Sequence, residues 1–292
     1  MRAMGIRVGF HVSIAGGISN SVNNAKKIGC SAFQIFSRNP RGWAAKPLVP
    51  DDVQLFKSGL SASGIDRNAV IVHMPYLPNL SGPDGEFYTK SVETLEWEMQ
   101  RCSALGIPYL VIHLGSHMGK GQPSGINQMV KAIQSALRKS KGGPMVLLEN
   151  NAGQKNSIGG NFEELRMILD QLDSPKEFGV CTDTCHLFAS GYDLRTTAEM
   201  DKTLERFDNV VGLKEIKFIH LNDSKGTLGS NLDRHEHIGL GMIGREGLAA
   251  FLNHRAIRGL PVIMETPIDE KRGNEQNLKV VLGLLKQAYF GL

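Results

Sequence analysis

Short apolar runs alternate with longer amphipathic stretches along almost the whole chain. Eight of these runs are nearly continuously apolar, which is typical of strands that are covered on both faces in a parallel sheet. The predicted strands are Arg7–Ser13, Ala32–Ser37, Ala69–Met74, Tyr109–Gly115, Met145–Asn150, Phe178–Thr184, Ile216–Asn222 and Pro261–Thr266.

The segments between these strands have the periodicity of helices. A helix is predicted at Asn161–Leu172, where Asn161 is suited to cap the first turn and acidic residues follow it. Another is predicted at Asn274–Ala288, near the end of the chain. A third carries an apolar stripe at the spacing of one helix face, formed by Leu95, Met99, Cys102 and Leu105.

The alternation of eight strands with helices predicts the fold. Strand–helix pairs in succession imply a parallel sheet with right-handed crossovers. Eight such units close naturally into an α/β fold of the (β/α)8 TIM barrel type. An open, doubly wound sheet is the alternative, but no GxGxxG motif follows the first strand, although Gly16 and Gly17 open the segment after it. No linker interrupts the pattern, so we expect residues 1–292 to form a single domain.

Histidines and carboxylates gather where the predicted strands end. Of the nine histidines, eight lie at predicted strand ends or in the loops just beyond, and only His254 lies on a predicted helix. A barrel of this type carries its active site at the carboxyl ends of its strands. Taken singly, each histidine is compatible with a hydrogen-bonded residue of the rim. Four carboxylates in one mouth would repel one another unless cations neutralised them, so metal ions are the simple explanation.

Nine residues of ligand type can be proposed for this mouth, more than the three or four protein ligands of one catalytic site. They suit two or three ions, and imidazole with carboxylate fits zinc, and also manganese, iron or cobalt. Such a set is compatible with a multi-metal hydrolase or a metal-dependent isomerase. The residues are His73, His113, Glu149, Asp183, His186, His220, Asp233, His235 and Glu265.

Composition narrows the class of protein. Hydrophobic residues make up 41% and charged residues 21%, with a formal net charge of +4, as in an ordinary globular protein. No apolar run reaches the roughly 18 residues of a membrane span, and the N-terminal segment does not read as a secretory signal. The four cysteines lack CxxC spacing, which favours buried thiols over disulfides or a thiolate zinc site. We therefore expect a cytoplasmic protein with no membrane partner.

Eight sequence strings stand out along the chain. They are GFHVSIAGG (9–17), FSRNPRGW (36–43), HMPYLPNL (73–80), HLGSH (113–117), LENNAGQ (148–154), GVCTDTCHLFASGYD (179–193), HLNDSKGTLGSNLDRHEHIGLG (220–241) and METP (264–267). Taken together and in this order, they resemble the endonuclease IV family of apurinic/apyrimidinic (AP) endonucleases. The sixth and seventh strings are highly specific, whereas VSIAGG or ETP alone would be weak.

The resemblance implies three metal ions, usually zinc, with manganese or iron as possible substitutes. It implies that Glu149 bridges ions and that Glu265 also orients the attacking water, which makes these two the catalytic residues. The implied ligand groups are His73 and His113 for one ion, Asp183, His220 and Glu265 for the second, and His186, Asp233 and His235 for the third.

The resemblance also implies the substrate, which is duplex DNA with an abasic site or a blocked 3′ end. The enzyme would hydrolyse the phosphodiester on the 5′ side, leaving a 3′-hydroxyl and a 5′-deoxyribose phosphate, as one step of base excision repair. Arg41 and Tyr76 match residues that the family inserts at the lesion; a solvated loop arginine and a packed rim tyrosine are the alternatives. We expect a monomer, because one lesion needs one active site.

Several neighbours of these residues carry weaker expectations. Lys225, Arg234 and Arg38 are candidates for phosphate contacts, with solvated surface charges as the alternative. Asn150, Asn222 and Asp223 sit beside proposed ligands and are candidates for orienting them. These assignments depend on side-chain directions that sequence spacing does not define.

Two other functions compete with the endonuclease. A sugar isomerase or epimerase on the same barrel also collects His, Asp and Glu at its strand ends, but needs only one or two metals and no DNA-inserting loop. A protein that binds lesions or stores metal would explain the ligands without turnover. The nine-residue ligand set and the FSRNPRGW loop favour the endonuclease.

Overall fold

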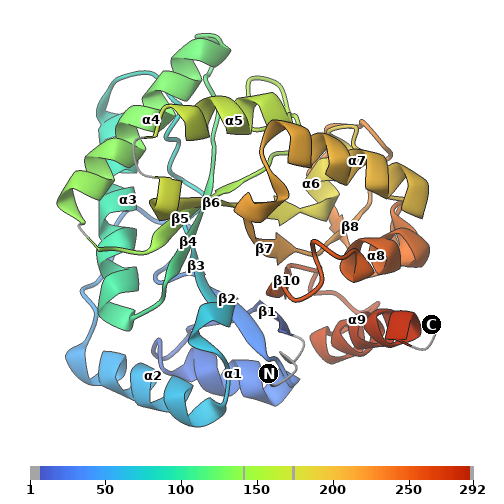
Figure 1. Ribbon diagram of the computed structural model, residues 1–292. Coiled ribbons are helices and arrows are strands. Elements are labelled where there is room, and N and C mark those ends of the chain that lie inside the picture. The colour runs from blue at the N-terminus through green and yellow to red at the C-terminus, as the bar shows by residue number, and fades with distance from the viewer. Residues whose placement is uncertain (1–6, 141, 173–174, 290–292) are drawn as a thin grey trace.

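Eight parallel strands close into a barrel, and helices surround it (Figure 1). The computed structural model describes residues 7–140, 142–172 and 175–289. Around the barrel the strands follow the order β1-β10-β7-β6-β5-β4-β3-β2. Their bounds are Val8–His11 (β1), Ala32–Ile35 (β2), Val70–His73 (β3), Tyr109–His113 (β4), Met145–Glu149 (β5), Phe178–Asp183 (β6), Ile216–His220 (β7) and Val262–Met264 (β10).

The prediction of a (β/α)8 TIM barrel is confirmed, and each observed barrel strand lies inside its predicted range. The observed strands are shorter than the predicted ones because the flanking residues turn into loops. For example, the predicted strand Pro261–Thr266 is reduced to Val262–Met264. Pro261 has no N–H to donate to a ladder, and the residues beyond Met264 belong to the loop above the strand.

Helices follow the barrel strands and bury one face against them. In α5, Asn161 caps the helix as predicted, because its Oδ1 accepts a hydrogen bond of 2.9 Å from the Glu164 N–H. His254, which was predicted to lie on a helix, instead follows the last residue of α8. Among the described residues, no helix is both long and apolar enough to cross a membrane. The helices are Asn20–Ile28 (α1), Pro50–Ser63 (α2), Glu86–Leu105 (α3), Gln122–Lys139 (α4), Phe162–Asp170 (α5), Thr184–Ala189 (α6), Thr197–Val210 (α7), Gly244–Asn253 (α8) and Asn274–Tyr289 (α9).

A separate apolar cluster fills the interior of the barrel and explains how the strands present their polar ends. Alternate residues of a strand point to the same side, so a residue two positions after an interior one also points inward. Seven members of this fully buried cluster lie two positions before a polar strand-end residue, each on a different strand. They are Ala32, Ile71, Val111, Leu147, Cys181, Phe218 and Ile263, and they precede Gln34, His73, His113, Glu149, Asp183, His220 and Glu265.

A small hairpin lies above the barrel and was not predicted. β8 (Asp223–Ser224) pairs antiparallel with β9 (His235–Glu236), so the long segment after β7 folds back on itself. The Asp223 side chain does not orient a proposed ligand, which corrects that expectation. Its buried carboxylate instead accepts hydrogen bonds of 2.9–3.3 Å from the backbone N–H groups of Ser224, Gly239, Gly241, Ile243 and Gly244. Asp223 therefore holds the loop beyond the hairpin.

Candidate metal centre

The structure brings all nine proposed ligands together above the carboxyl ends of the strands. Each has a nitrogen or oxygen atom within 4.0 Å of another member of the set. Six of the nine line an open cavity of about 370 Å³, and the other three, Glu149, Asp183 and His220, are buried. The residues that line this cavity are His73, Tyr76, His113, His186, Asp233, Arg234, His235, Glu265 and Pro267.

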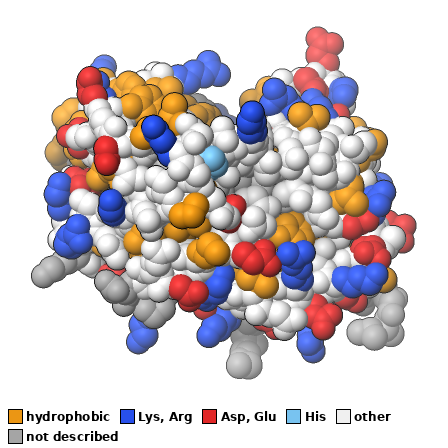
Figure 2. All heavy atoms as spheres, turned by 90° about the horizontal axis from the view of Figure 1, so that it is seen from above, with side chains coloured by type: hydrophobic (Ala, Val, Ile, Leu, Met, Phe, Trp, Pro, Cys, Tyr) orange, Lys and Arg blue, Asp and Glu red, His pale blue; other side chains and the backbone are white. Residues whose placement is uncertain are grey.

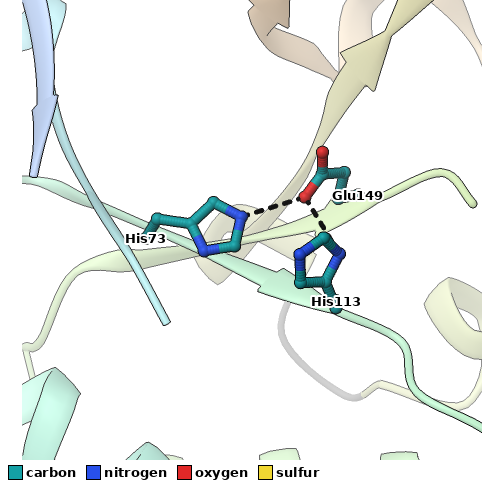
Figure 3. A group of neighbouring side chains, drawn as sticks. All are labelled: His73, His113 and Glu149. Atoms are coloured by element: carbon teal, nitrogen blue, oxygen red, sulfur yellow. Dashed lines mark hydrogen bonds and ion pairs between the residues drawn. The ribbon is translucent and has the colours of Figure 1, made fainter. Parts of the chain in front are cut away.

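Glu149, at the end of β5, is the centre of the cluster. Its Oε2 lies 3.1 Å from Nε2 of His73 and 3.4 Å from Nδ1 of His113, and both rings point toward this carboxylate (Figure 3). Its Oε1 lies 2.8 Å from Nδ1 of His220. The two oxygens thus face different histidines, which is the arrangement that a bridging carboxylate requires.

The donors form three overlapping groups, in each of which one ligand atom per residue lies within 4.8 Å of the others. Asp183 belongs to two of them, although the family resemblance implied a single ion for it. Asp233 adjoins the third group, with its Oδ1 3.2 Å from His186 Nε2 and 3.4 Å from His235 Nε2. The groups are His73, His113 and Glu149; Glu149, Asp183, His220 and Glu265; and Asp183, His186 and His235.

Three histidines are held from behind by backbone carbonyls. Nδ1 of His73 lies 2.7 Å from the Met74 carbonyl oxygen, Nδ1 of His186 lies 2.8 Å from that of Asn150, and Nδ1 of His235 lies 3.1 Å from that of Glu265. A carbonyl oxygen only accepts hydrogen bonds, so Nδ1 carries a proton in each ring, and Nε2 is the nitrogen that would bind a metal ion. Nε2 of His235 is buried and, among the described residues, has no hydrogen-bond partner.

Gln34, at the inner face of β2, is a functional residue that the sequence analysis missed. Its Nε2 donates to Oε1 of Glu265 at 2.6 Å, and its Oε1 accepts from Nε2 of His220 at 2.8 Å. Its Nε2 also lies 2.9 Å from Nδ1 of His11. Gln34 therefore fixes the Glu265 carboxylate and leaves Nδ1 of His220 directed at Glu149, where it would bind a metal ion. The available signal was a polar residue in an otherwise apolar strand.

Two asparagines orient Asp183, as expected. Asn222 Nδ2 donates to Oδ2 of Asp183 at 2.6 Å. Asn150 Oδ1 accepts from the Asp183 backbone N–H at 2.7 Å, and its Nδ2 donates to the Asp183 carbonyl at 3.2 Å. The Asp183 Oδ1 also caps α6 by accepting from the His186 N–H at 2.8 Å. The start of this helix therefore holds Asp183 and His186 in one arrangement.

Of the two residues predicted to contact DNA, Tyr76 lines the cavity and Arg41 lies on a loop outside it. Tyr76 is exposed at the cavity, and its ring centroid lies 5.1 Å from that of Phe36, at the base of the loop that carries Arg41. Arg41 is exposed on that loop and does not line the cavity. On the face shown in Figure 2, Lys and Arg side chains are mixed with Asp and Glu rather than gathered in one patch.

The three candidate phosphate contacts differ in exposure. Lys225 and Arg234 are exposed, and Arg234 lines the cavity. Arg38 is buried, with its Nε 3.2 Å from Oε1 of Glu98 on α3. The expectation that Arg38 contacts phosphate is therefore wrong, because its guanidinium is directed into the protein.

Comparison with known proteins defines the family. Residues 22–288 match the family model described as "Xylose isomerase-like TIM barrel". The chain is 53% identical over 274 residues to "Probable endonuclease 4" of Nitrosopumilus maritimus, an alignment that covers 94% of this chain and 98% of that protein. The chain belongs to the endonuclease IV family. A solved structure of endonuclease IV from Thermus thermophilus is 36% identical and superimposes with a TM-score of 0.85, covering 96% of this chain and 99% of that one.

Membership of the endonuclease IV family confirms the expectation of a DNA-cleaving hydrolase. Sugar-converting enzymes share only the fold. A D-tagatose 3-epimerase-like protein superimposes with a TM-score of 0.73 at 18% identity, covering 97% of this chain and 98% of that one. Similarity at that level shows a shared fold and does not identify a substrate, so the isomerase alternative has no support beyond the barrel itself.

The pKa values of the clustered imidazoles and carboxylates show which side chains are charged before any metal ion binds. Burial alone would lower the pKa of His186, but Asp183, Glu149 and Asp233 outweigh it and raise this pKa to about 10. Burial lowers the pKa of His113 to about 4, against the opposing effect of Glu149. Burial would also raise the pKa of Glu149, yet the neighbouring imidazoles hold it well below its usual range. The Glu149 carboxylate therefore stays ionised, and either protons or metal ions must balance its charge.

We predict that zinc binding near His186 releases a proton at neutral pH. The pKa of about 10 means that the metal-free imidazole is protonated at pH 7, whereas a ligand must be neutral. Zinc affinity should rise by about tenfold per pH unit for each proton released, up to that pKa. Calorimetric titration in two buffers of different ionisation enthalpy measures the release. Equal heats in both buffers would contradict the prediction.

We predict that Gln34→Ala lowers zinc affinity by roughly 10–100-fold, the loss typical of partners that orient metal ligands. The change leaves the Glu265 carboxylate and the His220 Nε2–H without their shared partner. Competition with a zinc chelator measures affinity, and the absorption spectrum of the cobalt-substituted protein reports ligand geometry. Asn24→Ala is the control, since that amide binds a backbone carbonyl away from the cavity. Wild-type affinity and spectrum in a folded Gln34→Ala protein would count against the role.

Proposed function

We propose that this protein is a metal-dependent AP endonuclease of DNA repair. It hydrolyses the phosphodiester on the 5′ side of an abasic site in duplex DNA and leaves a 3′-hydroxyl and a 5′-deoxyribose phosphate. It also trims blocking groups from 3′ ends. The proposed cofactor is three zinc ions per chain, for which manganese or iron can substitute. The protein acts as a monomer in the cytoplasm.

One observation carries the proposal. Nine imidazole and carboxylate side chains converge above the strand ends, and six of them line one cavity. Glu149 and Asp183 link the three donor groups to one another. A structural metal site is closed by its ligands, whereas this cluster opens onto a cavity of about 370 Å³. An open cluster with shared carboxylates supports several adjacent ions at a place that a phosphate group can enter. The relatives named endonuclease 4 supply the class of substrate.

Different side chains of the cluster would hold the metal ions, orient the attacking water and contact the phosphate. When bound, the metal ions would lower the pKa of a water molecule and stabilise negative charge on the phosphate oxygens. Glu149 and the histidines around it would hold those ions. Glu265 faces the cavity with its Oε1 held by Gln34 at 2.6 Å, so it is fixed to accept a hydrogen bond from the attacking water. Arg234, which also lines the cavity, would face the substrate phosphates.

Tyr76 and Arg41 would recognise the lesion. Partial desolvation of the hydroxyl at the cavity and the charges of Glu265 and Glu149 raise the pKa of Tyr76 to about 12, so its hydroxyl remains a hydrogen-bond donor at neutral pH. Its exposed ring at the cavity suits stacking or insertion beside a sugar that has no base. Arg41 would enter the gap that the missing base leaves. Extruding an abasic sugar costs less than extruding a stacked nucleotide, which favours the lesion.

We predict that the protein cuts a duplex oligonucleotide with one tetrahydrofuran site on the 5′ side of that site and leaves a 3′-hydroxyl. This analogue cannot undergo β-elimination, so a lyase would leave it whole. Removal of the metals should abolish cutting, and added zinc should restore it. Glu149→Gln should reduce cutting by more than the roughly 10–100-fold loss seen for groups that only orient ligands. Mapping of the product ends and metal analysis measure these outcomes.

Two results would overturn the proposed function. The first is no cutting by protein shown to hold its metals. The second is cutting that persists at full rate after the metals are removed. A cut with a 3′ end other than a hydroxyl would reject the hydrolytic chemistry while leaving the substrate class in place.

We predict that Arg41→Ala lowers the preference for abasic over intact duplex by about tenfold, or ~1.4 kcal/mol, with metal content unchanged. The residue is exposed and lies outside the cavity, so its loss should not affect the metal ligands. Lys46→Ala removes a charge from the same loop and serves as the control for general attraction to DNA. Binding and cutting of matched duplexes measure the preference. An unaltered preference would show that Arg41 is a solvated loop residue with no part in lesion recognition.

A further inference from the structure

The loop that follows β2, residues 36–49, is attached along one face of α3. Its contacts on that helix are separated by seven, four and three residues, a spacing that places them on one side. The Trp43 and Phe87 rings meet edge to face, with centroids 5.0 Å apart. The helix residues that contact the loop are Phe87, Thr94, Glu98 and Arg101.

Glu98 is the centre of this attachment. Its Oε2 accepts a hydrogen bond of 2.6 Å from the Ser37 hydroxyl, and its Oε1 lies 3.2 Å from Nε of Arg38. The Arg38 and Glu98 side chains are 3% and 0% exposed. A buried ion pair requires both partners, because removing one leaves an uncompensated charge out of water. The pair therefore holds the beginning of the loop in one arrangement.

Two arginines extend the attachment along the loop. Arg101 donates to the Ser37 hydroxyl at 2.7 Å, to the Ser37 carbonyl, and to the Lys46 carbonyl at 3.0 Å. Arg38 donates to the Trp43 carbonyl at 3.0 Å. Both sides of the loop are thus tied down, around a tip formed by residues 39–42.

Arg41 lies at this tip. Its backbone N–H donates to Asn39 Oδ1 at 3.0 Å, and within the described residues its exposed side chain makes no hydrogen bond or ion pair. The base of the loop adjoins the metal cluster, because the Phe36 ring centroid lies 4.2 Å from that of His11 and 5.7 Å from that of His73. The loop thus presents an unattached cation from a stem that is fixed beside the cluster.

We propose that Glu98 is a positioning residue for lesion recognition, which acts through Ser37 and Arg38 to hold the loop that presents Arg41. The proposal rests on the role given to Arg41 in the proposed function. A stem ordered on folding need not be ordered again when DNA binds, so less binding free energy is lost to loop ordering. Glu98 is fully buried and lies outside the metal groups.

The test compares Glu98→Gln with Glu96→Gln. Glu96 is a buried carboxylate on the same helix, but it pairs with Lys139 at 2.8 Å rather than with the loop. Glu98→Gln should lower the preference for abasic over intact duplex by about tenfold, through KM rather than kcat, with metal content unchanged. Glu96→Gln should leave this preference as it is. In an Arg41→Ala background, Glu98→Gln should cause no further loss, because the two changes act on one contact.

A second variant and a second measurement keep the test independent of stability. Ser37→Ala removes the hydroxyl shared by Glu98 and Arg101 without leaving a buried charge, and it should lower the preference in the same direction. Amide hydrogen exchange of residues 39–47 should be faster in Glu98→Gln and Ser37→Ala than in Glu96→Gln. This measurement needs no activity, so it tests the attachment even if the wild-type protein does not cut abasic DNA.

Two outcomes would overturn the role of Glu98. One is full lesion preference in folded Glu98→Gln and Ser37→Ala proteins. The other is a loss that adds to that of Arg41→Ala, since it would show that Glu98 acts on another part of the site. Failure of the wild-type protein to cut the tetrahydrofuran duplex would instead reject the proposed function.

Discussion

Glu149 is an ionised carboxylate that is only 1% exposed, with nitrogen atoms of four imidazoles 2.8–3.7 Å from its oxygens. A buried charge costs several kcal/mol unless it is paired, so this residue requires the groups around it to meet at one point. Those groups come from β3, β4, β7 and the start of α6. Only a closed barrel brings these elements to one place, and the charge balance at its mouth is what a set of metal ions would complete.

Hydrogen-bond partners around this centre orient several of the proposed ligands. Backbone carbonyls hold Nδ1 of three histidines, and Gln34 holds His220 and Glu265 together. Asn222 fixes one oxygen of Asp183, and the first turn of α6 takes the other. The donors are thereby arranged before any ion arrives, which reduces the reorganisation that metal binding and phosphate chemistry require.

The loops above the barrel are held by two different devices. Asp223 holds its loop through backbone N–H groups, among them that of Gly241, where a Cβ would lie 2.6 Å from Asp223 Oδ1. Glu98 instead holds the loop of residues 36–49 through Ser37 and Arg38, so that attachment depends on side-chain identity. Both devices place a buried carboxylate under a segment that would otherwise be free. They keep the rim ordered around a site that has to accept a large substrate.

The barrel, its strand positions and the convergence of the nine proposed ligands were readable from the sequence, because periodicity is local and the carboxyl ends of parallel strands meet at one rim. The sequence also determined Asn161 as a cap, since capping involves only nearby residues. Tertiary structure alone decided which groups share Asp183, that Gln34 points into the site, that Asp223 holds a loop, and that Arg38 is buried while Arg41, three residues later, is exposed. Each of these depends on contacts between elements far apart in the chain. Spacing along one strand or loop shows where a side chain stands, but its partners are set only when the barrel closes and the helices pack around it.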